Sequence, residues 1–150
     1  MSKNIILLSL VFIAVFTLAL HVEAVTYYWY YAADNQTFWM GTGSSGPTSL
    51  TQKTNPGYYA RGLTVASDGT IYMATETSNG RIIKSTDKGA SWTTVGYSGY
   101  YPRGIVANKQ GVLFVAQENA EVKKSVDGGA SWTNAANLGR TPRGITADSN

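Results

Sequence analysis

Short segments of apolar and β-branched residues alternate with polar turns along the chain from Val25 onward. Segments 71–74 and 113–116 are unbroken apolar runs, which is typical of strands covered on both faces. Glycine, serine, aspartate and asparagine mark the turns between segments, and the chain after Ala24 shows no helical periodicity. The pattern therefore predicts an all-β fold. The expected strands are 27–31, 37–40, 63–66, 71–74, 81–84, 92–95, 105–107, 113–116, 121–124 and 132–135.

The expected strands belong to a sequence repeat. An Arg-Gly pair recurs at nearly even spacing, at Arg61, Arg103 and Arg143. Segment 85–93 returns as segment 125–133, and in both copies the tryptophan stands at the same distance before the next of these arginines. Four short strands in a repeat of about 40 residues are typical of a blade of a β-propeller.

The repeat divides the chain into units. Residues 58–99 and 100–139 are complete blades of four antiparallel strands, and residues 140–150 begin a further one. Residues 25–57 are a degenerate first blade, in which Leu50 takes the place of the tryptophan. About three blades cannot close a ring, since propellers use about four to eight. We expect either the front part of a longer propeller, which we favour, or copies that join head to tail.

The two complete units share the pattern Ser-x-Asp-x-Gly-x-x-Trp. Its residues are Ser85, Asp87, Gly89 and Trp92 in one unit, and Ser125, Asp127, Gly129 and Trp132 in the next. The pattern resembles the Asp box, or bacterial neuraminidase repeat. Within that group, the combination of an Arg-Gly strand start with this box is similar to the photosystem-assembly propellers. The chain resembles sortilin-type receptors and sialidases more distantly. The resemblance implies a non-enzymatic scaffold, in which the aspartate accepts hydrogen bonds from turn amides and the tryptophan packs between blades.

Segment 1–24 has the features of a secretory signal-peptide helix. Lys3 precedes an uncharged and mostly apolar run from Ile5 to Leu20, and Ala24 offers a cleavage site. That run is short for the roughly 20 residues that span a bilayer, so we expect cleavage rather than an uncleaved anchor. The mature chain is then secreted or held at the cell surface, without a membrane segment. Asn35 begins a glycosylation sequon, which counts only in a eukaryotic source.

Composition narrows the function classes. The net charge is +3 without a block of like charges, so nucleic-acid binding is not indicated. There is no cysteine, and the single histidine, His21, lies in the leader. We therefore expect no metal, no cofactor and no catalytic residue. Glu76 and Glu118 stand at matching repeat positions, which argues against a unique active site. The enzyme alternative is the front part of a sialidase-like glycosidase whose catalytic residues lie outside this chain.

The candidate binding residues precede the first strand of each unit. In a propeller that strand lines the central channel, so a loop before it reaches one mouth. Arginines there attract carboxylates or sulfates, and tyrosines stack on sugars or anchor proteins. We expect a protein, carbohydrate or other anionic ligand. In the competing interpretation, each arginine hydrogen-bonds carbonyls of a neighbouring blade. A second functional alternative is a structural surface protein that self-associates through open blade edges. The candidate residues are Arg61, Arg103, Arg143, Tyr58, Tyr59, Tyr100 and Tyr101.

Overall fold

The computed structural model describes residues 26–33 and 36–148, and all of its regular structure is β-strand. The expected leader (1–24) and the Asn35 sequon lie outside these residues. No helix in the described part is long and apolar enough to cross a membrane. The strands are β1 (Tyr27–Ala32), β2 (Phe38–Gly43), β3 (Leu50–Gln52), β4 (Ala60–Val65), β5 (Ile71–Thr75), β6 (Arg81–Ser85), β7 (Thr93–Tyr97), β8 (Pro102–Ala107), β9 (Leu113–Gln117), β10 (Glu121–Ser125) and β11 (Thr133–Asn137).

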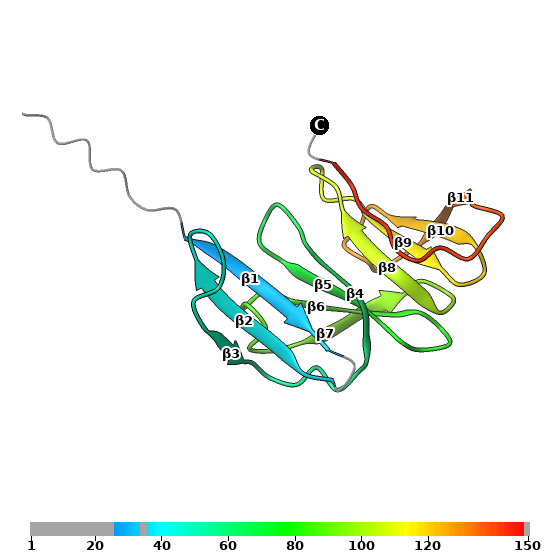
Figure 1. The fold of residues 1–150 in the computed structure, drawn as a ribbon. Helices are drawn as coiled ribbons and strands as arrows, with labels where there is room; N and C mark the ends of the chain where they lie inside the picture. Colours follow the sequence, from blue (N-terminus) through cyan, green and yellow to red (C-terminus); the bar gives the residue numbers. More distant parts are fainter. Residues whose placement is uncertain (1–25, 34–35, 149–150) are drawn as a thin grey trace, which may run out of the picture.

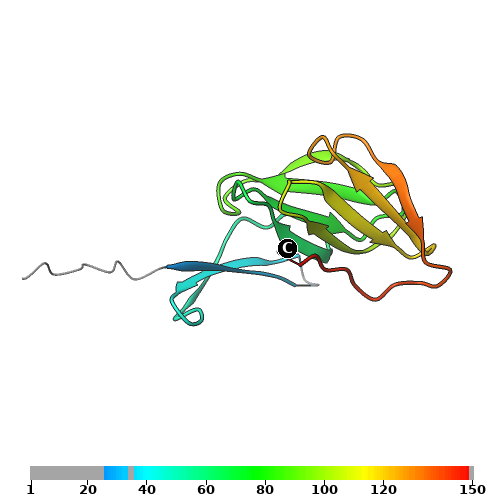
Figure 2. The same ribbon diagram turned by 90° about the horizontal axis from the view of Figure 1, so that it is seen from above.

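The strands form three antiparallel sheets in chain order. The first sheet is β1-β2-β3, the second is β4-β5-β6-β7, and the third is β8-β9-β10-β11. Each strand pairs with its neighbour in sequence, so every sheet is a simple meander. Figure 1 shows the first sheet at one end of the molecule and the third at the other, and Figure 2 shows the second and third sheets stacked. The all-β architecture with blade-like sheets is confirmed.

The core lies between the sheets rather than within one of them. Successive residues of a strand point to opposite faces of its sheet. A strand in a sheet that is covered on both faces is therefore apolar at every position. All five residues of β5 are buried for this reason. Between the first and second sheets, the buried residues are Phe38, Ile71, Met73 and Ile83. Between the second and third sheets, they are Tyr72, Ala74, Ile82, Ile105, Leu113 and Val115.

The serine–aspartate turn, defined here as residues 85–91 and 125–131, is closed by its own side chains. The Ser85 hydroxyl donates to the Asp87 carboxylate (2.7 Å) and accepts the Gly89 N–H (2.8 Å). Ser91 donates to the same carboxylate through its N–H (2.8 Å) and its hydroxyl (2.6 Å). The hydrogen bonds to this carboxylate, first of all that from the Ser91 hydroxyl, lower the pKa of Asp87 from 3.8 to about 2. The same pattern recurs in the second copy, among Ser125, Asp127, Gly129 and Ser131.

Each serine–aspartate turn docks against the sheet that precedes it. Trp92 meets Phe38 of the first sheet edge-on, with ring centroids 4.9 Å apart. Trp132 packs against the core between the second and third sheets, and its indole N–H donates to the Gly129 carbonyl (2.9 Å). A methyl group on Gly89 would lie 2.2 Å from a ring carbon of Phe38. Both tryptophans are therefore partly buried between sheets rather than exposed on the surface.

The first sheet has three strands, where each later sheet has four. One detail differs from the sequence-based expectations. The residues just before Leu63 and Ile105, expected to be loop, are strand, because β4 begins at Ala60 and β8 at Pro102. Proline is tolerated as the first residue of a strand, where its missing N–H removes no essential bond. The first two arginines of the repeat thus lie inside the innermost strands.

Candidate functional site at the starts of the inner strands

The first two arginines of the repeat occupy β-bulges. In the second sheet Ala60 faces Thr75 and Gly62 faces Ala74, so Arg61 between them has no partner in the ladder. The register of the third sheet shifts in the same way between Pro102 and Gly104, on either side of Arg103. A bulge re-aims the side chain of the extra residue. Both guanidinium groups are thereby turned toward the end of the neighbouring strand.

Each bulged arginine pairs with a glutamate of its own sheet. The distance from Arg61 Nη2 to Glu76 Oε1 is 2.5 Å, and that from Arg103 Nη2 to Glu118 Oε1 is 2.6 Å. The side chains of these pairs are between 32% and 41% exposed, so water reaches all four. The competing interpretation places the arginines on carbonyls of a neighbouring blade. The observed ion pairs lie within one blade and cancel two positive charges.

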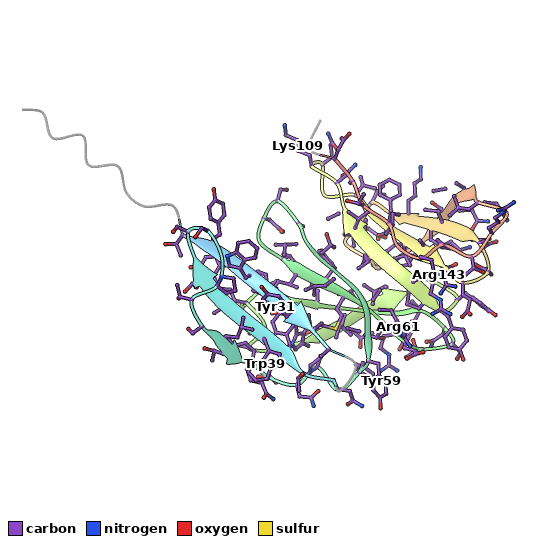
Figure 3. All side chains as sticks on the ribbon, viewed as in Figure 1. Tyr31, Trp39, Tyr59, Arg61, Lys109 and Arg143 are labelled. Carbon is purple, nitrogen blue, oxygen red and sulfur yellow. The ribbon has the colours of Figure 1, made fainter. Side chains whose placement is uncertain are left out.

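The third arginine is placed differently. Arg143 lies in segment 140–148, which follows the third sheet and belongs to none of the described strands, and the residue is exposed. Figure 3 shows Arg61, Arg143 and Tyr59 toward the same end of the molecule, with Lys109 at the opposite end. Arg61 and Arg143 therefore lie on the same side of the molecule as Tyr59 in this view. Of the three, only Arg143 forms no ion pair with a described acidic residue.

The four candidate tyrosines divide into one structural residue and three exposed ones. The Tyr58 ring lies under the guanidinium of Arg81, 4.3 Å from its centre, and packs on the core between the first two sheets. Tyr59, Tyr100 and Tyr101 are 47%, 40% and 36% exposed. The last two meet edge to face, with ring centroids 5.5 Å apart. Exposed tyrosines beside arginines form a surface suited to contact with a partner.

We call this surface the arginine–tyrosine face. Its residues are Tyr59, Arg61, Tyr100, Tyr101, Arg103 and Arg143, together with Glu76 and Glu118.

Gln117 supports the arginine–tyrosine face, although the sequence analysis does not single it out. Its side chain is fully buried, and Nε2 donates to the Ser98 carbonyl (2.8 Å) and to the Ser98 hydroxyl (3.1 Å). It also reaches the Tyr100 carbonyl at 3.4 Å. These bonds tie the end of β9 to the segment that carries Tyr100 and Tyr101. The signal that could have found Gln117 is a polar residue at the end of an otherwise apolar strand.

The opposite ends of the inner strands form a different surface. An open hollow of about 380 Å³ lies there between β4, β8 and segment 140–148, lined by Val65, Ala107, Lys109 and Asp148 among others. Among the described residues, no group of three or more His, Cys, Asp or Glu side chains could hold a metal ion.

No protein-family model matches the sequence, and no curated protein matches it. Solved structures are similar to the chain in fold, and three of them are β-propellers. One is described as YCF48 bound to D1 peptide (TM-score 0.57, 18% identity, 70% of this chain and 36% of that chain). A second is virginiamycin B lyase from Staphylococcus aureus (TM-score 0.55, 19% identity, 81% of this chain and 45% of that chain). A third is the calcium-binding protein regucalcin from Agrobacterium tumefaciens (TM-score 0.54, 14% identity, 78% of this chain and 47% of that chain).

These similarities establish the fold of the chain as β-propeller blades. The chain spans less than half the length of each of these three structures. The three differ in function, since one is a lyase and another is described with a bound peptide. A common fold therefore leaves the function to be argued from the site.

Proposed function

We propose that the chain is a non-enzymatic binding module, secreted or displayed at the cell surface, that holds an acidic segment of a partner protein on the arginine–tyrosine face. The observation that carries this proposal is the recurrence of a bulged arginine beside exposed tyrosines at the same end of consecutive inner strands. We also propose that the serine–aspartate turns are Asp boxes, which act as structural corners.

The chemistry of the arginine–tyrosine face favours a carboxylate-bearing peptide. A guanidinium has five N–H donors in a planar fork, so one arginine can bind a glutamate oxygen and a ligand carboxylate at the same time. Tyrosine rings supply contact area with few rotatable bonds, which lowers the entropy lost on binding. The similarity to a propeller described with a bound peptide supports a protein partner over a glycan.

The proposal assigns no catalytic role to Glu76 and Glu118. Each carboxylate holds an arginine, at 2.5 Å and 2.6 Å respectively, in the same arrangement in two successive sheets. A glycosidase needs two carboxylates that flank one scissile bond. Repetition of one arginine–glutamate pair supports a scaffold role instead.

Selection from a displayed random-peptide library tests this proposal. We expect acidic peptides to be enriched on the wild-type chain, and their affinity to fall by about tenfold or more when Arg61, Arg103 and Arg143 are changed to Gln. The matched control is Lys109→Gln, which removes a cation at the opposite ends of the inner strands (Figure 3). Unchanged affinity in the triple variant, or enrichment without acidic residues, would contradict the proposal.

A further inference from the structure

The three strands of the first sheet correspond to the second, third and fourth strands of a later sheet. Residues 29–32 read Trp-Tyr-Tyr-Ala, and residues 71–74, one repeat later, read Ile-Tyr-Met-Ala. The pairing agrees, because Tyr31 faces Trp39 in the first sheet as Met73 faces Ile83 in the second. The strand without a counterpart in the first sheet is therefore the innermost one, the equivalent of β4 and β8.

An open position exists where that innermost strand belongs. In the second sheet β5 lies between β4 and β6, whereas in the described residues β1 pairs only with β2. A hollow of about 450 Å³ lies between β1 and β4, lined by Tyr30, Tyr31 and Ala32 on one side and by residues 60–63 on the other. Tyr31 is 42% exposed, although its equivalents Met73 and Val115 are fully buried.

Segment 140–148 has the sequence and the packing of an innermost strand, but it pairs with no other described strand. It carries the third Arg-Gly pair and packs beside β8 through Ile145, which would lie 3.1 Å from a methyl group on Gly104. β8 packs beside β4 in the same way, with the Ile105 nitrogen lying 2.6 Å from a methyl group on Gly62. Among the described residues, this segment belongs to no sheet. It thus presents a strand edge at one end of the stack, and β1 presents an edge at the other.

We propose that residues 140–148 of one copy insert beside β1 of a second copy and complete its first sheet. The register follows from the later sheets, in which Leu63 faces Met73 and Ile105 faces Val115. Ile145 is then opposite Tyr31, and the two strands form the antiparallel ladder that β4 forms with β5.

One side chain of the donated strand supports this register. The Thr64 hydroxyl accepts the Ala107 N–H from the next inner strand at 3.0 Å. Thr146 stands at the position of Thr64 in the repeat, one residue after the equivalent of Leu63. In the inserted strand its hydroxyl is placed to accept the N–H of Val65, the equivalent of Ala107, in the receiving copy.

The outer faces of the two end sheets are complementary as well. Residues Tyr27, Trp29 and Tyr31 alternate with Tyr30 and Ala32, which pack toward the second sheet. The first three therefore form an aromatic face on the side without a neighbouring sheet.

At the other end of the stack, Phe114 and Val122 take the positions of Tyr72 and Ile82, which pack against the next sheet. Phe114 and Val122 are only half-buried. Strand insertion brings these two partly apolar faces together.

The number of sheets favours a closed pair of copies. The described residues of one copy supply three sheets once the first sheet is completed, so those of two copies supply six. Six lies within the range of about four to eight blades at which propellers close. Because both contacts are then used within the pair, assembly stops at the dimer rather than continuing as a fibre. This inference does not depend on the proposed peptide partner.

Engineered disulfides test the insertion, because the chain has no cysteine of its own. Residues directly opposite in an antiparallel pair have Cβ atoms about 4.5–5.5 Å apart, close enough for a disulfide after a small adjustment. The full chain carrying Tyr31→Cys and Ile145→Cys is oxidised and run on a non-reducing gel. We expect most of the chain in a covalent dimer that reducing agent dissociates, and a dimer mass for the wild type by light scattering.

The matched control carries Tyr31→Cys and Thr146→Cys, in which the second thiol is one residue along and points to the other face. We expect little dimer from it. Equal cross-linking in both variants, an intramolecular disulfide, a ladder of larger species, or a monomeric wild type at 100 µM (a concentration on the order of one that saturates a micromolar dimer) would each overturn the proposal. Thermal melting of both variants confirms that they fold.

Discussion

The first and second sheets use the same repeat positions with opposite results. In β5 all five residues are buried, whereas in its equivalent β1 none is buried and three are exposed. Composition alone does not explain the difference, because at the one position where the two strands share a tyrosine, Tyr72 is buried and Tyr30 is only partly buried. It follows from the neighbours. The second sheet has an inner strand, β4, and a neighbouring sheet on each of its two faces. Among the described residues, the first sheet has no inner strand and has a neighbouring sheet on one face.

This comparison shows that a blade is stabilised mainly by what lies against it. The apolar residues of one sheet divide between two cores, one shared with the preceding sheet and one with the following sheet. Burial of apolar area contributes about 25 cal/mol per Å². A sheet with one covered face therefore has much less of this stabilisation, and its open face is an association surface.

The largest expected difference in the free energy of unfolding is between substitutions at equivalent positions of the first and second sheets. Met73→Ala removes a fully buried side chain and should lower the free energy of unfolding by about 2–5 kcal/mol. Tyr31→Ala, on the exposed face, should lower it by about 1 kcal/mol or less in a sample diluted to the monomer. Urea denaturation of both variants measures the contrast. Equal losses at dilution would mean that Tyr31 is buried within a single copy.

A smaller contrast is expected between two glycines that share a φ of +84°. Gly69→Ala meets nothing within 4 Å and carries only the backbone penalty, about 1–2 kcal/mol. Gly89→Ala carries the same penalty and in addition pushes its methyl group into Phe38 of the preceding sheet, which adds about 1–3 kcal/mol. Calorimetric melting of the two variants isolates the docking of the turn. Identical melting temperatures would refute a tight contact between turn and sheet.

The next largest effect is expected from acid, which should weaken the serine–aspartate turns. The pKa values of Asp87 and Asp127 fall from 3.8 to about 2 on folding, so the stabilisation is complete above about pH 5 and is lost as the pH falls from about 4 to 2. Changing both residues to Asn should flatten the dependence of the urea midpoint on pH in this window. Asp68 and Glu121, whose pKa values are also lowered, leave a residual slope. An unchanged slope would mean that the hydrogen bonds of the turns do not stabilise the ionised form of these carboxylates.

The smallest effect is expected at the ion pairs. Arg61 and Glu76 are each about one-third exposed, and such pairs contribute about 0.2–1 kcal/mol. Glu76→Gln should therefore barely change the melting temperature, while it removes a carboxylate that competes with the ligand for the Arg61 guanidinium. We expect tighter binding of the selected acidic peptides to this variant. Weaker binding would show that the glutamate itself contacts the ligand.

The sequence predicts the sheets well because their signal is local and repeated. Apolar runs such as 71–74 and turns such as Asp87 to Gly89 carry the alternation and the turn chemistry within a few residues. Each tryptophan, expected as the first residue of the last strand of its sheet, lies one residue before that strand. The Asp-box assignment remains a proposal, as does the role of the candidate binding residues.

The remaining features depend on contacts that a linear pattern does not contain. The bulges at Arg61 and Arg103 arise from the register between two strands, so the sequence pattern alone predicts loops there. The sequence marks the two glutamates as matching positions, yet their pairing needs the bulge to turn the arginine toward them. The missing inner strand becomes visible only when β1 is aligned with β5 by its pairing to β2.

Amide hydrogen exchange of β1 and β5 as a function of protein concentration tests most directly whether neighbours decide the order of each sheet. In a dilute sample, the β1 amides that do not bond to β2 should exchange as fast as loop amides, while those of β5 exchange slowest in the chain. At high concentration, these β1 amides should become protected as the donated strand arrives. Equal protection of β1 and β5 at every concentration would contradict the account.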